Sequence, residues 1–193
     1  NNTALGNQAL RYNVFGKNNA AFGDYAGKHL DDGNVGVSSP ANDNNVFIGG
    51  NAGNSDVNSY RNVYVGYEAG GGTHNPTHPT VPVVAPENKH SNIFIGYQSG
   101  YAETGNERLY IENSNSAAPL IYGEFDNNIL RVNGVLQIDD PTGTGYALPA
   151  ADGTANQVLT TDGSGAVTWA AGGGGASSPF NASWGFDGEV ATG

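Results

Sequence analysis

The residues best suited to chemistry in this chain of 193 are two histidines in a proline-rich segment. His74 and His78 stand four residues apart, and proline lies between them and directly after the second. Imidazole nitrogens bind zinc and similar metals, and a trimer would present three copies of each ring around its axis. Prolines favour an extended surface segment, however, where histidines are usually only solvated. The pair is a candidate metal site, and we expect no cofactor.

Paired carboxylates are the second candidate for chemistry. Asp31-Asp32 and Asp139-Asp140 stand beside glycine, asparagine or proline, which indicates loops rather than the facing walls of a cleft. No serine, histidine and aspartate show a local arrangement for nucleophilic catalysis, and the absence of cysteine excludes thiol nucleophiles and thiolate metal sites. We therefore expect that the chain is not an enzyme. A tail spike that degrades polysaccharide through two carboxylates is a minor alternative.

The composition indicates an all-β protein. Glycine contributes 30 residues, whereas methionine is absent and charged residues make up only 13%. Glycine permits the backbone conformations of tight turns, and the scarcity of helix-forming residues disfavours helices. The net charge of −11 opposes binding to nucleic acid and to anionic lipid. No apolar run approaches the roughly 18 residues that a membrane span needs, so we expect no membrane insertion.

The element that must position these residues is a tandem repeat over about residues 1–112. Each copy reads asparagine, three apolar or small residues, then glycine, and the five copies end at Gly6, Gly23, Gly49, Gly66 and Gly96. Successive copies are 17, 26, 17 and 30 residues apart, so a coil of 17 residues with two insertions accounts for every spacing. Short repeats that cannot bury an apolar face alone are typical of stacked coils. We predict a short-coil β-solenoid, or β-roll, with loops inserted at about residues 27–45 and 70–92.

The asparagine and the glycine of the motif are expected to form the corners of each coil. We expect the glycine to turn the chain after each strand, because glycine takes such a corner without the steric cost of a Cβ atom. The asparagine before the strand is expected to hydrogen-bond to the backbone at the opposite corner, or to stack on its equivalents as a ladder. Both residues therefore have structural roles in this interpretation.

The three residues between asparagine and glycine predict the oligomeric state. In a strand such as Val46–Ile48, neighbouring side chains point to opposite faces, yet all three are apolar, so both faces must be covered. We expect the coil interior to cover one face, and the face that bears Phe47, Tyr64 and Phe94 to pack against another copy of the chain. A threefold axis would let every copy do so equivalently, which predicts a parallel homotrimer. The alternative is a monomeric solenoid whose inserted loops cover both faces.

The repeats resemble those of known fibre proteins. Residues 2–10 and 92–100 look like the coil repeats of trimeric autotransporter adhesin heads, which form left-handed β-rolls. They look still more like the repeats of phage tail fibres and of large surface proteins of Bacteroidetes-type bacteria. Residues 153–169 are similar to a segment common near the distal end of tail-fibre proteins. The resemblance implies an extracellular trimer with a rigid shaft, although the two insertions are longer than a strict adhesin head tolerates.

Smaller β modules are expected after the repeats. Residues 107–112 predict a last, divergent coil or a neck strand, and residues 113–140 predict a β neck module with strands at 120–125 and 129–132. Asn133-Gly134 favours a tight hairpin into residues 135–138. Residues 141–170 predict a distal hairpin module, with Trp169 as an inter-chain plug on the threefold axis. Residues 171–193 read as a glycine-rich linker and an aromatic tail that could lock subunits end to end.

The function predicted from these features is the structural shaft of an extracellular trimeric attachment fibre, on a virion tail or a bacterial surface. Its expected partners are two further copies of the chain and a cell-surface glycan or protein receptor, bound at loops or at a tip. The alternative is the repeating subunit of a self-polymerising extracellular filament. The sequence begins inside a repeat, so we expect a piece of a longer fibre.

Overall fold

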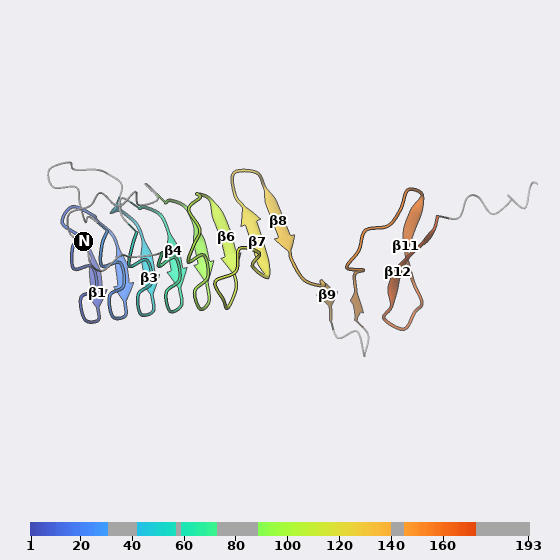
Figure 1. Ribbon diagram of the computed structural model, residues 1–193, viewed down its shortest axis with the longest axis horizontal. Helices are drawn as coiled ribbons and strands as arrows, with labels where there is room; N and C mark the ends of the chain where they lie inside the picture. The colour runs from blue at the N-terminus through green and yellow to red at the C-terminus, as the bar shows by residue number, and fades with distance from the viewer. Residues whose placement is uncertain (31–41, 57–58, 73–88, 140–144, 173–193) are drawn as a thin grey trace, which may run out of the picture. The chain divides into compact units, whose positions relative to one another are not determined.

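The computed structural model describes residues 1–30, 42–56, 59–72, 89–139 and 145–172. They divide into two compact units, Asn1–Asn133 and Gly134–Gly193 (Figure 1). No α-helix occurs in the ranges described, and the regular structure there consists of strands and turns. The all-β prediction is confirmed.

An eight-stranded sheet runs through the first unit (Figure 1). Its strands follow the same order along the chain and across the sheet: β1 (Thr3–Leu5), β2 (Ala20–Phe22), β3 (Val46–Ile48), β4 (Val63–Val65), β5 (Ile93–Ile95), β6 (Arg108–Ile111), β7 (Ile121–Glu124) and β8 (Ile129–Val132). The first six are parallel, so the chain advances by one coil per strand. This repeated parallel stacking is the arrangement expected of a β-solenoid.

The end of this sheet answers one open question and corrects one prediction. β6 pairs in parallel with β5, so residues 107–112 begin as a sixth coil, and β7 and β8 then add an antiparallel hairpin. The tight hairpin predicted at Asn133-Gly134 is wrong. Asn133 instead closes the β7–β8 pair, because its backbone N–H donates to the Leu120 carbonyl and its side-chain amide donates to the Pro119 carbonyl at 2.6 Å.

The second unit contains two strand pairs, which a single parallel bridge between Ala147 and Ala166 connects. β9 (Gln137–Ile138) pairs antiparallel with β10 (Tyr146–Ala147), and β11 (Gln157–Thr161) pairs antiparallel with β12 (Val167–Ala171). The second pair is the hairpin that the sequence predicted. Its turn is held by the Asp162 carboxylate, which accepts hydrogen bonds from the backbone N–H groups of Ser164 and Ala166. Trp169 lies half-buried against Gly153 and donates from Nε1 to the Ala151 carbonyl at 2.8 Å.

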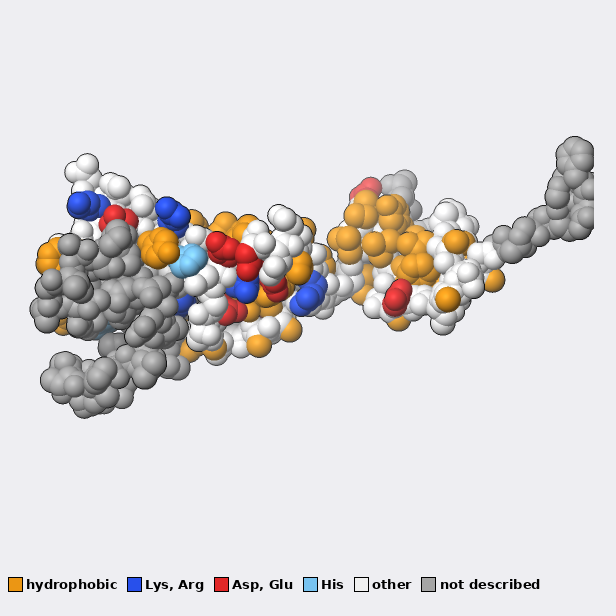
Figure 2. Space-filling view, turned by 90° about the horizontal axis from the view of Figure 1, so that it is seen from above, with side chains coloured by type: hydrophobic (Ala, Val, Ile, Leu, Met, Phe, Trp, Pro, Cys, Tyr) orange, Lys and Arg blue, Asp and Glu red, His pale blue; other side chains and the backbone are white. Residues whose placement is uncertain are grey.

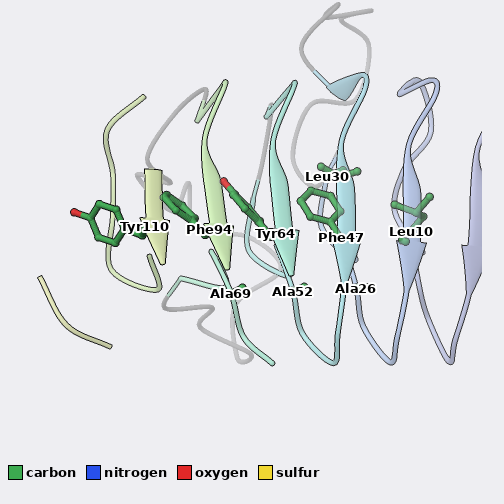
Figure 3. Close-up of a cluster of buried hydrophobic side chains, with 10 residues drawn as sticks. Leu10, Ala26, Leu30, Phe47, Ala52, Tyr64, Ala69, Phe94 and Tyr110 are labelled. Carbon is green, nitrogen blue, oxygen red and sulfur yellow. The ribbon is translucent and has the colours of Figure 1, made fainter. Parts of the chain in front are cut away.

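The core of the first unit is a single column of side chains inside the coils (Figure 3). The middle residues of β3, β4 and β5 are Phe47, Tyr64 and Phe94, and each is 0% exposed. Their rings follow one another at centroid distances of 5.4 and 4.9 Å. The prediction that these three residues pack against another chain is therefore wrong. They point into the coil, and the parity of a strand then turns its first and third residues outward.

Glycines on the opposite wall of the coil make room for the rings. A Cβ atom at Gly53 would collide with the Phe47 ring, and one at Gly70 would collide with the Tyr64 ring. Both glycines have φ close to +60°, which glycine adopts without strain. The interior is thus filled from the strand side wherever the middle residue is aromatic.

Leucines fill the interior where the strands carry alanine. The middle residue of β2 is Ala21, and Leu10 and Leu30 are buried in the same cluster (Figure 3). Leu10 stands where later repeats have glycine, and its φ of 52° is the left-handed value found at those glycines. In the first coils the wall opposite the strands therefore supplies the large side chains, whereas in the later coils the strands supply them. The interior stays packed in both cases.

Candidate functional site: the outward face of the sheet

Five glycines turn the chain after the strands of the repeats. Gly6, Gly23, Gly49, Gly66 and Gly96 have φ values between 117° and 141°, a range that side chains with a Cβ atom rarely adopt. A Cβ atom at each would also collide with the carbonyl at the corner of the next coil. Close stacking of the coils therefore requires glycine here. This gives the glycines a structural role at the corners where the sequence placed them.

The asparagines of the repeat form a continuous ladder. The side-chain oxygens of Asn2, Asn19, Asn45, Asn62 and Asn92 each accept a hydrogen bond from the backbone N–H at the same position of the next coil, at 2.9 to 3.0 Å. Their amide groups donate across the corner to backbone carbonyls, as from Asn45 to Ser59. The asparagine side chains thus both bond to the backbone across the corner and form a ladder, as expected. The ladder fixes the register of successive coils.

Because the middle residue of each strand is inside, the other two residues form an outward face. Across β1 to β6 these residues are Thr3, Leu5, Ala20, Phe22, Val46, Ile48, Val63, Val65, Ile93, Ile95, Leu109 and Ile111. Thr3 is the one polar residue among them. We call this set, with its continuation across β7 and β8, the outward face.

The antiparallel strands continue this face without a break. Leu109 of β6 pairs with Gly123 of β7, which pairs with Leu130 of β8, and directly paired residues point to the same side of a sheet. In the same register, Ile111 pairs with Ile121, which pairs with Val132. The outward face therefore spans all eight strands and carries no charged residue.

Large apolar side chains of the outward face are open to solvent in the single chain. Leu5 is 69% exposed and Leu130 is 70% exposed, at the two ends of the sheet. Phe22, Ile48 and Ile95 are each 39–41% exposed. A contiguous apolar surface of this kind is rare on a soluble monomer and usually marks a site of association. Its chemistry suits a second apolar surface rather than a polar ligand.

The second unit also exposes most of its apolar side chains, and Figure 2 shows hydrophobic side chains on the surfaces of both units. The exposed set in this unit is Val135, Leu136, Ile138, Tyr146, Val158 and Leu159, at 41–50% each. No hydrophobic residue is buried among its described residues, 134–139 and 145–172. The described strands of this unit therefore bury no hydrophobic side chain within one chain.

A carboxylate and a tyrosine close the open end of the parallel coils. Glu103 accepts hydrogen bonds from the Tyr110 hydroxyl at 2.5 Å and from the backbone N–H groups of Thr104 and Gly105. Burial alone would raise the pKa of Glu103, but these hydrogen bonds outweigh burial and hold its pKa below the usual value. Burial and the carboxylate also raise the pKa of Tyr110. The pair is therefore a cap on the parallel coils, and the Tyr110 ring packs between those of Phe94 and Tyr122 at centroid distances of 5.3 and 5.5 Å.

The predicted metal ligands His74 and His78 lie outside the described residues. His29 is buried and stacks on Tyr12 at 5.1 Å, and His90 stacks on Tyr60 at 4.8 Å. In the parts of the chain that the structure describes, no group of three histidine, aspartate or glutamate side chains could hold a metal ion.

Two features of the interior were not predicted from the sequence. One is the exchange between Leu10 and the aromatic residues, which the change from alanine in the first two strand centres to aromatic residues in the later ones could have revealed. The other is an ion pair between Asp56 and Lys89, whose side chains are 0% and 2% exposed. The two residues belong to different coils, and no local motif connects them.

Comparison with known proteins identified no relative: no family model matches the sequence, and no curated protein or solved structure is similar to it. Within the described residues, no helix has the length and apolar character needed to cross a membrane.

Proposed function

We propose that this chain is the structural shaft of an extracellular trimeric attachment fibre, of the tail-fibre or adhesin kind. The observation that carries the proposal is the outward face, an uncharged apolar surface across eight strands of one chain. Three copies in parallel register around an axis would bury this face equivalently. The solenoid then acts as a rigid spacer, and a glycan or protein receptor binds at its loops or at a tip.

The energetics of this face favour association. Burying an exposed valine, leucine or isoleucine side chain contributes about 1.5–3 kcal/mol, and the face offers such residues on every strand except β2, which carries Phe22. This gain would offset the loss of translational and rotational freedom when chains associate. The exposed apolar residues of the second unit add to the same tendency, because strands without a core of their own gain one by packing between chains.

The test is the oligomeric state of the purified chain, measured by light scattering coupled to size exclusion. We expect three chains per particle. Ile48→Lys together with Ile95→Lys places charges on the outward face, and this variant should dissociate. Leu120→Lys is the matched control, because Leu120 is 56% exposed but lies outside the strands, and it should leave the trimer intact.

A monomer at all accessible concentrations would contradict the proposal. Particle shape separates the shaft from the alternative of a self-polymerising filament. Electron microscopy at low concentration should show rods of one length if the chain is a shaft, and open-ended fibrils if it is a filament subunit. Release of reducing sugar from surface polysaccharide would instead support a tail spike.

A further inference from the structure

The ion pair between Lys89 and Asp56 lies inside the first unit, between two coils. Lys89 Nζ is 2.5 Å from Asp56 Oδ1 and also donates a hydrogen bond to the Gly70 carbonyl at 3.1 Å. The backbone of Lys89 is fixed as well, because its carbonyl accepts from the Asn62 amide in the asparagine ladder. Contacts at the backbone and at the amine of Lys89 therefore hold the amine next to the Asp56 carboxyl group.

The surroundings of the pair exclude water. Tyr64 and Ser59 are 0% exposed, and the Tyr64 ring centroid lies 5.8 Å from Lys89 Nζ. Burial raises the pKa of Asp56, while Lys89 and the hydroxyl groups of Tyr64 and Ser59 act in the opposite direction. Two charges removed from water in this way often cost more free energy than their attraction returns. Burial therefore favours the protonated, neutral form of Asp56.

We propose that Lys89 and Asp56 become joined by an amide bond between Nζ and Cγ. Transfer of one proton from the amine to the carboxylate within the pair gives the two neutral reactants of such a bond, and their fixed proximity replaces the usual need for high concentration. The amine attacks Cγ, the bond from Cγ to one carboxyl oxygen breaks, and that oxygen leaves as water. A proton from Nζ passes to the leaving oxygen, so that one amide and one water molecule result. No oxidant, reductant or other reactant is needed.

Such a bond would replace disulfides in a chain that has no cysteine. It would close a covalent loop from residue 56 to residue 89, which contains most of the longer of the two insertions in the repeats. Opening of the coils around that insertion would then be restricted even when the hydrogen bonds of the ladder break. The proposal does not depend on the proposed function, because the bond forms within one chain.

The test is the intact mass of the denatured full chain after purification. The bond predicts a mass lower than that of the sequence by one water molecule, and a branched peptide that joins Lys89 to Asp56 in tandem mass spectrometry. Lys89→Arg keeps the positive charge but lacks the nucleophile, so this variant should show the full mass. Lys28→Arg, at a lysine outside the pair, should still show the loss of water.

Cyclisation at aspartate-glycine steps, such as Asp162-Gly163, also removes one water and must be distinguished. Such a cyclic imide opens again under mild alkali, whereas the amide between side chains resists it. A full mass in folded protein kept for days at neutral pH would overturn the proposal. So would a loss of water that survives in Lys89→Arg or disappears in alkali.

Discussion

The two units use the same kinds of residue in opposite ways. The first unit buries ten hydrophobic residues in one cluster and fixes its coils with the asparagine ladder. In the described part of the second unit no hydrophobic residue is buried, and its strands form two pairs that a single bridge connects. A two-stranded hairpin is only marginally stable in water. The repeat therefore builds a core within one chain, whereas the described distal strands leave their large apolar side chains exposed.

The largest effect should come from separating the two units. A fragment of residues 1–133 is expected to fold and to unfold cooperatively, because it retains its whole core. Residues 134–193 alone at low concentration should show no cooperative transition. Circular dichroism over a range of protein concentrations would check this, and structure that appears only at higher concentration would identify association as its source. A monomeric fragment of residues 134–193 with a cooperative thermal transition would break the comparison.

Phe47→Ala should be the most damaging single change in the first unit. The ring is fully buried, and removing it leaves a cavity between coils, so the free energy of unfolding should fall by about 3–5 kcal/mol. Both tryptophans, Trp169 and Trp184, belong to residues 134–193. Far-ultraviolet circular dichroism should therefore report the loss, while tryptophan fluorescence reports the second unit.

Phe125→Ala is the matched control for this change. Phe125 is 48% exposed in the turn between β7 and β8, so its loss should lower the free energy of unfolding by less than about 1 kcal/mol. Equal effects of the two substitutions would show that the column of rings is not the core.

The corners and the all-β class could be predicted from the sequence because glycine and asparagine have backbone and side-chain roles that few residues share. The inward face could not be assigned from the strand alone, since Val46–Ile48 is apolar throughout. Its signal lies in the opposite wall, where Ala52 and Gly53 leave space that only a large residue can fill. The contact between Asp56 and Lys89 could not be predicted, because it depends on how the second insertion returns to the coil.

Moving the large side chain from the strand to the opposite wall of the coil should restore part of the free energy of unfolding that Phe47→Ala removes. A Cβ atom at Gly27 would lie 2.6 Å from the Phe47 ring and 2.9 Å from Leu10, which stands at the equivalent position of the first coil. Gly27→Leu alone should destabilise, because its side chain would collide with the ring. Combined with Phe47→Ala it should recover about 1–2 kcal/mol by filling the cavity. A double-mutant cycle of unfolding free energies measures this coupling, and additive losses would contradict the exchange of walls.

The smallest effect should come from protonating the cap at the end of the coils. Glu103 is held as a carboxylate by the Tyr110 hydroxyl and two backbone N–H groups, so its pKa in the folded chain lies below its usual value. A depressed pKa contributes stability that is present above the pKa of the unfolded chain and is lost as the pH falls through the pKa of the folded chain. Stability of the first unit should therefore decline on the acid side of the ordinary glutamate range.

Glu103→Gln should flatten that decline, because the amide does not titrate. Because Glu103 is half-buried, solvent screens this contribution, and chemical denaturation at a series of acidic pH values should resolve it as a difference between parent and variant. The same denaturation series, followed by tryptophan fluorescence, should show no difference between parent and variant in the second unit.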